Sequence, residues 1–150
     1  LLLDHLLDHP YFSQPPPKST GRELFCLQWL DELLQPGYRK LPDVDVQRTL
    51  TEFTAQSITR SLEQFGPPVK QVLVCGGGAH NDFLMCRLQA LLPELRVETT
   101  EEYGLHPDWV EAVAFAWLAK QALEGKPGNL PGVTGANRLV ILGAIYPGNI

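Results

Sequence analysis

The sequence has little methionine, little cysteine, no basic run and no long hydrophobic segment. Met85 is the one methionine and the chain opens on three leucines, so we expect a segment of a longer protein. No stretch approaches the ~20 apolar residues of a bilayer span. Asp4 and His5 interrupt the apolar opening and no basic residues precede it, which argues against a signal peptide. We therefore expect a cytoplasmic protein with no membrane partner.

Cysteine, charge and histidine exclude further classes. The three cysteines, Cys26, Cys75 and Cys86, form no CxxC pair, and two of them sit among apolar neighbours, so we expect buried free thiols in a reducing compartment. A net charge of -5 without a Lys/Arg cluster argues against a nucleic-acid partner. The four histidines lack the spacing of metal ligands, so no metal site is predicted.

Residues 1–66 have the pattern of a mainly helical portion. Thr20 and Glu23 have the spacing of a capping box, which predicts a helix that ends at residues 36–37. A longer helix is expected over residues 43–65, with its first aspartate as the cap.

The segment Lys18-Ser19-Thr20 resembles the end of a phosphate-binding Walker loop. Three prolines at 15–17 stand where that loop needs glycines, so a P-loop is excluded. Ser19, Thr20 and Arg22 could instead face a ligand from a polar helix start, and simple helix capping is the alternative.

Residues 67–150 have the pattern of an α/β portion. The apolar run 69–75 is typical of a strand buried in a parallel sheet, and a helix followed by a second strand at 95–100 would complete a βαβ unit. Residues 109–123 predict a helix that is apolar on nearly all sides and belongs in a core. A last strand is expected at 139–145.

The turn Gly76-Gly77-Gly78 follows the first predicted strand and precedes a helix. Glycines there allow backbone amides to approach a ligand closely, and a helix N-terminus favours anionic groups. Asn81 would be the N-cap of that helix or a ligand contact. The alternatives are a turn that only serves packing, and a dinucleotide fingerprint in which Asn81 replaces the third glycine and Glu98 is the ribose-binding acid.

Glu111 stands at the start of the apolar helix. Its spacing from Asp108 suits a capping box, and the alternative is a carboxylate that faces a polar cleft. No Ser-His-Asp, Cys-His or paired-carboxylate set can be assembled from the spacings, so no catalytic residue is assigned and the chemistry is expected to be incomplete in this chain.

Four motifs, in this order, resemble the anhydro-N-acetylmuramic acid kinase family. They are PPPKSTGRE at 15–23, CGGGAHN at 75–81, EAVAFAWLA at 111–119 and NLPGVTGA at 129–136. The resemblance implies the C-terminal lobe of a bacterial two-lobe sugar kinase, spanning residues 1–150. The lobe would have the actin-like (ribonuclease H-like) α/β ATPase fold, a mixed sheet flanked by helices with a helical N-terminal portion.

The resemblance also implies an activity. ATP with Mg²⁺ would phosphorylate the 6-hydroxyl of 1,6-anhydro-N-acetylmuramic acid, and water would open the anhydro ring, giving N-acetylmuramic acid 6-phosphate in peptidoglycan recycling. The phosphate loop and catalytic aspartate belong to the first lobe, so this chain alone would be inactive. The N-terminal lobe is the implied partner, and the family suggests a homodimer.

By motif, the resemblance places Gly76, Gly77, Gly78 and Asn81 on the nucleotide. It places Glu111 in the cleft on the sugar side, together with Ser19, Thr20 and Arg22. Two other functions remain open from the residues: an NAD-binding oxidoreductase domain and a non-catalytic interaction module.

Overall fold

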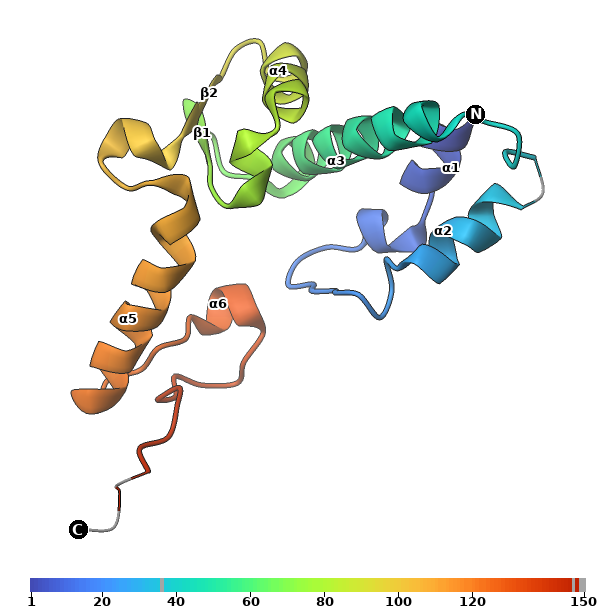
Figure 1. The fold of residues 1–150 in the computed structure, drawn as a ribbon. Coiled ribbons are helices and arrows are strands. Elements are labelled where there is room, and N and C mark those ends of the chain that lie inside the picture. The colour runs from blue at the N-terminus through green and yellow to red at the C-terminus, as the bar shows by residue number, and fades with distance from the viewer. Residues whose placement is uncertain (36, 147, 149–150) are drawn as a thin grey trace. The chain divides into compact units, whose positions relative to one another are not determined.

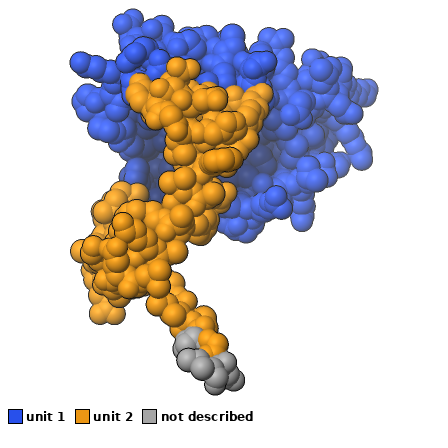
Figure 2. Space-filling view, turned by 60° about the vertical axis from the view of Figure 1, so that its left-hand side comes forward, with its two compact units in different colours: residues 1–72, 81–98 blue, residues 73–80, 99–150 orange. Residues whose placement is uncertain are grey.

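The structure is a computed structural model that describes residues 1–35, 37–146 and 148 (Figure 1). It divides into two compact units, coloured separately in Figure 2. Unit 1 comprises residues 1–72 and 81–98, and unit 2 comprises residues 73–80 and 99–150. The chain is of mixed α/β class with mostly helical structure, as the sequence predicted at this coarse level.

The elements of unit 1 are mainly helices, and unit 2 is built around one long helix. The helices of unit 1 are α1 (Leu2–Leu7), α2 (Leu27–Leu34), α3 (Asp43–Phe65) and α4 (Asp82–Leu91). Unit 2 contains α5 (Val110–Leu123), α6 (Pro131–Thr134) and the 3-10 turns Gly77–His80, Thr100–Tyr103 and Pro107–Trp109. Two strands, β1 (Gln71–Val74) and β2 (Arg96–Thr99), pair in parallel and connect through α4.

The core of unit 1 forms where α1 and α4 pack against α3 (Figure 1). Leu6 of α1 and Leu88 of α4 are the largest fully buried side chains. Ala55 of α3 is fully buried too, and its small side chain lets a neighbouring helix approach closely. The buried hydroxyl of Thr59 donates to the carbonyl of Gln56, which satisfies its hydrogen bond inside the core.

An aromatic cluster extends this core toward α2. Phe25 stacks on Phe12 with ring centroids 5.4 Å apart and meets Trp29 edge-on at 5.0 Å. Phe53 of α3 contacts Phe12 edge-on at 5.2 Å. Such edge and offset contacts are the preferred arrangements of aromatic rings, so the cluster holds Phe12, Phe25 and Trp29 against α3.

One ion pair joins α3 to α4 within unit 1. Arg87 donates from Nε to Glu52 Oε2 at 2.6 Å and from Nη2 to Oε1 at 3.1 Å, and Gln56 adds a third hydrogen bond at 2.8 Å. The Arg87 hydrogen bonds hold the pKa of Glu52 below its ordinary value of 4.5. Because the folded-state pKa is the lower one, the pair stabilises the fold above pH 4.5.

We expect Glu52→Gln to lower the free energy of unfolding at pH 7 by about 1 kcal/mol, because the substitution removes a charge-assisted pair that is only partly screened. As the pH falls through the folded-state pKa of Glu52, the difference between the two proteins should shrink. Thermal unfolding of both proteins from pH 7 to pH 3 measures this. A difference that stays constant with pH would contradict the assignment.

The parallel strand pair is shorter and less buried than the sequence predicted. The expected buried strand at 69–75 is present only as β1, and Val69 and Leu73 are each 39% exposed. The strands are exposed because a sheet of only two strands leaves both edges and part of one face uncovered. The βαβ connection itself was predicted correctly.

Two helix starts differ from the prediction. The capping box at Thr20 does not form: α2 begins at Leu27 without a side-chain cap, and Glu23 instead accepts a hydrogen bond from the Gly21 amide at 2.8 Å. The helix α2 ends at Leu34, and the predicted stop at Pro36 lies outside the described residues. Pro42, not Asp43, precedes the first turn of α3.

The C-terminal part also departs from the prediction. The helix expected at 109–123 is present as α5, yet none of its residues is buried, which contradicts the expected core position. The described residues of 139–145 form no strand. Cys75 and Cys86 are exposed rather than buried. Within the described part of the chain, no helix has both the length and the apolarity needed to cross a membrane.

Candidate functional site

The glycine turn lies directly after β1, in unit 2. Gly76 adopts a left-handed φ of 73°, and the 3-10 turn Gly77–His80 follows, with the Ala79 amide donating to the Gly76 carbonyl at 3.0 Å. A Cβ placed on Gly76 or on Gly77 would meet no atom within 4 Å. The main chain of the turn is therefore open to an approaching ligand on the side where side chains would otherwise project.

Two contacts anchor this turn to the segment that precedes α5. The Gly76 amide donates to the Pro107 carbonyl at 3.0 Å, and His80 Nε2 lies 2.7 Å from Asp108 Oδ1. Both side chains of the second contact are about half exposed. The two contacts bring the glycine turn next to the 3-10 turn Pro107–Trp109, after which α5 begins with Glu111 in its first turn.

Asn81 is the N-cap of α4, as one reading of the sequence predicted. Its Oδ1 accepts a hydrogen bond from the Leu84 amide at 3.0 Å, which satisfies one of the free amides of the first turn. Asn81 therefore replaces the third glycine of a dinucleotide fingerprint with a capping side chain. Glu98, the ribose-binding acid of that alternative, has Oε1 3.9 Å from Arg96 Nη1.

Glu111 does not form the predicted capping box with Asp108. The helix begins after Trp109, which makes no side-chain capping bond, and the Asp108 amide instead donates to His106 Nδ1 at 3.3 Å. Glu111 is exposed in the first turn of α5, where a carboxylate interacts favourably with the helix dipole. Its carboxylate is thus available to a ligand.

The other predicted substrate residues belong to unit 1. Ser19 and Arg22 are exposed and Thr20 is half-buried, and none of them caps a helix. The structure brings Gly76, Gly77, Gly78 and Glu111 into unit 2, whereas Asn81, Ser19, Thr20 and Arg22 are in unit 1.

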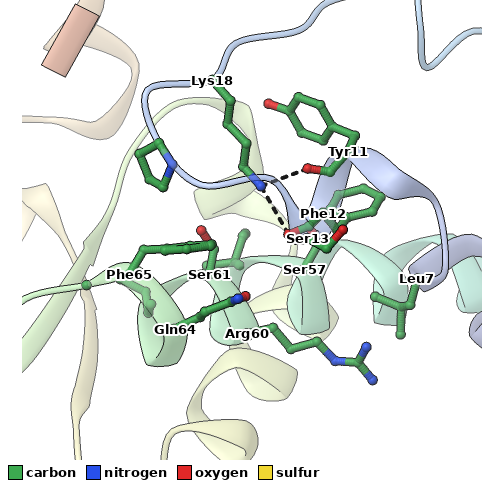
Figure 3. A pocket seen from close by; sticks show the side chains of 14 residues that line it. Leu7, Tyr11, Phe12, Ser13, Lys18, Ser57, Arg60, Ser61, Gln64 and Phe65 are labelled. Atoms are coloured by element: carbon green, nitrogen blue, oxygen red, sulfur yellow. Dashed lines mark hydrogen bonds between the residues drawn. The ribbon is translucent and has the colours of Figure 1, made fainter. Parts of the chain in front are cut away.

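A pocket of about 660 Å³ lies between residues 10–18 and α3 in unit 1 (Figure 3). Tyr11, Phe12 and Phe65 supply aromatic walls, and Lys18 reaches inward. Its ammonium donates to the carbonyls of Tyr11 at 2.9 Å and Phe12 at 3.1 Å, and lies 4.8 Å from the centroid of the Tyr11 ring. The sequence did not predict that Lys18 lines a pocket, because the segment Lys18-Ser19-Thr20 was compared only with a Walker loop.

No metal cage is built by the described residues, which contain no group of three His, Cys, Asp or Glu side chains suited to an ion. What the glycine turn offers is backbone amides without side chains, beside a helix start that carries one carboxylate. Such amides can bind polar or anionic ligand groups.

The two glycines allow a matched test of the turn. We expect Gly76→Ala to reduce the free energy of unfolding by about 1–2 kcal/mol, because a side chain is strained at a left-handed φ. Gly77→Ala should be neutral or slightly stabilising, since the position is open and has no positive φ. Chemical denaturation of both variants measures the difference, and equal losses would contradict the turn geometry.

Comparison with known proteins gives a consistent family match. The family model described as "Anhydro-N-acetylmuramic acid kinase" matches residues 1–148. Curated relatives with that name include proteins from Coxiella burnetii (strain Dugway 5J108-111), 56% identical over 98% of this chain, and Pasteurella multocida (strain Pm70), 58% identical over 97%. A relative from Nitrosomonas europaea is 53% identical over 97% of the chain. The chain spans 39% of the length of each of these three relatives.

Proposed function

Because the chain belongs to the anhydro-N-acetylmuramic acid kinase family, we propose that it is the C-terminal lobe of an ATP-dependent kinase that acts on 1,6-anhydro-N-acetylmuramic acid. The reaction phosphorylates the 6-hydroxyl and opens the anhydro ring with water, giving N-acetylmuramic acid 6-phosphate for peptidoglycan recycling in the bacterial cytoplasm. The activity is that of the complete kinase, meaning this chain joined to a preceding N-terminal lobe. We further propose the actin-like fold and a homodimer for that protein.

The open glycine turn is the observation that carries this proposal. Gly76 and Gly77 present main chain with no atom within 4 Å of where a Cβ would lie. A nucleotide can therefore approach the amides of Gly77 and Gly78 at hydrogen-bonding distance, while the Gly76 amide donates to the Pro107 carbonyl. The Pro107 and Asp108 contacts hold the turn in one conformation, so less ordering entropy is lost when a ligand binds.

The remaining site residues divide between nucleotide and sugar. Asn81, at the start of α4, contacts the nucleotide together with the glycine turn. Its side chain is held in place by the hydrogen bond that it accepts from the Leu84 amide. Glu111 faces the sugar with a carboxylate that can accept hydrogen bonds from hydroxyl groups. Ser19, Thr20 and Arg22 supply further polar contacts to the sugar.

Mg²⁺ accompanies ATP in this proposal, and the described residues contain no group of three His, Cys, Asp or Glu side chains that could hold the ion by themselves. The ion neutralises phosphate charge when bound, and its protein ligands would come from the N-terminal lobe. Phosphoryl transfer depends chiefly on positioning and charge stabilisation. This chain contributes by binding the nucleotide and by orienting the sugar.

The test is turnover by the complete kinase. Incubation with ATP, Mg²⁺ and 1,6-anhydro-N-acetylmuramic acid should yield N-acetylmuramic acid 6-phosphate, detected by mass spectrometry, while this chain alone should yield none. No product from a folded complete kinase would contradict the proposal. Tighter binding of NAD than of ATP would indicate the oxidoreductase alternative, and binding of neither would indicate a non-catalytic module.

A further inference from the structure

The loop that carries three of the proposed sugar residues has no regular secondary structure. It covers residues 14–26, between the 3-10 turn Pro10–Ser13 and α2. Residues 15–17 are prolines, which have no backbone N–H, so the main chain there donates no hydrogen bond to the rest of unit 1. The position of the loop therefore depends on contacts made by side chains.

Lys18 makes such a contact, directly after the prolines (Figure 3). Its ammonium donates to the carbonyl oxygen of Tyr11 at 2.9 Å and to that of Phe12 at 3.1 Å. It also lies over two aromatic rings, 4.8 Å from the ring centroid of Tyr11 and 5.5 Å from that of Phe65 at the end of α3. A cation in this position is attracted by the negative face of the ring. Lys18 thus attaches the loop to the 3-10 turn and to α3.

The groups that Lys18 contacts are themselves held in place. Phe12 stacks on Phe25 with ring centroids 5.4 Å apart and meets Phe53 of α3 edge-on at 5.2 Å. Tyr11 meets Phe25 edge-on at 5.6 Å. The carbonyls of Tyr11 and Phe12 are therefore fixed against the core of unit 1, and a side chain bonded to both of them is fixed too.

The charge of Lys18 is used on carbonyl oxygens. Among the described residues that line the pocket around it, none is an Asp or a Glu that could draw the ammonium away. The Lys18 side chain is half-buried, and hydrogen bonds from an ionised donor are about twice as strong as neutral ones. These contacts suit a side chain that fixes the path of the main chain.

The three proposed sugar residues, at positions 19, 20 and 22, follow Lys18 within four positions. Their side chains make no hydrogen bond or ion pair with another described residue. On the far side of Thr20, the Gly21 amide donates to Glu23 Oε1 at 2.8 Å. The placement of the three side chains therefore depends on a main chain that Lys18 holds at one end.

We propose that Lys18 is a positioning residue for the sugar: it holds residues 14–22 in the conformation that receives the sugar, before the sugar binds. The inference rests on the proposed function in taking Ser19, Thr20 and Arg22 as the sugar contacts. Lys18 acts through these residues and does not touch the reacting atoms. Without its ammonium, the loop would become ordered only when the sugar binds, and the lost conformational entropy would weaken binding.

The first test measures the order of the loop in the complete kinase. Lys18→Met keeps an unbranched side chain but removes the charge and the donors. Tryptic cleavage after Arg22 requires the loop to open, so we expect its rate to rise about tenfold or more in this variant, because cleavage follows the population of the open form. Cleavage after Arg96, in β2, should not change.

The matched control for this test is Lys40→Met, which removes an exposed lysine of the same unit. It should leave the cleavage rates after Arg22 and Arg96 unchanged. Equal cleavage after Arg22 in the Lys18→Met and unmodified proteins would overturn the proposal.

The second test separates positioning from folding by steady-state kinetics. Lys18→Met should raise the KM for 1,6-anhydro-N-acetylmuramic acid about tenfold or more and leave kcat and the KM for ATP within about twofold of the unmodified values. A role in folding alone would reduce the amount of active protein, which lowers the apparent kcat and leaves the sugar KM unchanged. An unchanged sugar KM would overturn the proposal even if the loop opened.

The outcomes separate this inference from the proposed function. A complete kinase that makes no phosphorylated sugar refutes the proposed function, and the cleavage rate after Arg22 still decides whether Lys18 holds the loop. A complete kinase that is active, and whose sugar KM does not respond to Lys18→Met, refutes the positioning role alone.

Discussion

Gly77→Val is expected to raise the KM of the complete kinase for ATP about 10- to 100-fold, equivalent to roughly 1.4–2.8 kcal/mol of binding free energy. The position is open and has no positive φ, so the fold can accept the new side chain. The added methyl groups would occupy the space through which a nucleotide approaches the amides of the turn. Steady-state kinetics at varied ATP, with the sugar saturating, measures the effect.

The control for this substitution is Gly37→Val, at another glycine with open space around it and no positive φ. It should leave the KM for ATP unchanged. The melting temperature of both variants should stay within about 2 °C of the unmodified kinase, because neither substitution displaces an existing contact. A normal KM for ATP in the Gly77→Val kinase would show that the nucleotide does not bind at the glycine turn.

Glu111→Gln is expected to reduce kcat/KM for the sugar about 30-fold, the loss that corresponds to about 2 kcal/mol for one hydrogen bond to a charged group. Glu111 makes no capping contact at the start of α5, so the melting temperature should hardly change. Parallel measurements of sugar kinetics and thermal unfolding separate the two roles.

Glu102→Gln serves as the matched control for Glu111, because it removes an exposed carboxylate of unit 2 outside the proposed site. It should leave sugar kinetics unchanged. If Glu111→Gln lowers stability and turnover together, Glu111 has a structural role instead. The KM for ATP should be the same in all three proteins.

Local patterns in the sequence predicted the helices and the turn well. The extent of α3 follows from its run of helix-compatible residues between Pro42 and Gly66, and α4 follows from leucines at positions 84 and 88 together with the Asn81 cap. These signals act within a few residues of each other, so they need no knowledge of the rest of the fold.

The sequence did not predict which distant segments pack against one another. The apolar runs at 69–75, 109–123 and 139–145 predicted buried elements. In the structure β1 is mostly half-buried, α5 contains no buried residue, and residues 139–145 form no strand. An apolar pattern predicts that a segment is buried, but it does not predict which other segment packs against it. Under the proposed function, that partner is the N-terminal lobe.

The candidate site was predictable only in its local part. Glycines at 76–78 after a strand indicate an open turn, and the structure has this geometry at Gly76 and Gly77. The anchor between His80 and Asp108 joins residues 28 positions apart, and no periodicity in the sequence signals such a contact. The failure of the Thr20 and Asp108 capping boxes shows that spacing alone does not determine which polar side chain binds a helix start.

A crystal structure of the complete kinase with a non-hydrolysable ATP analogue and Mg²⁺ tests the central claim most directly. We predict that polar atoms of the analogue lie within hydrogen-bonding distance of the backbone amides of Gly77 and Gly78, with no side chain between them. An analogue bound elsewhere, with the turn covered by side chains of the N-terminal lobe, would contradict the claim.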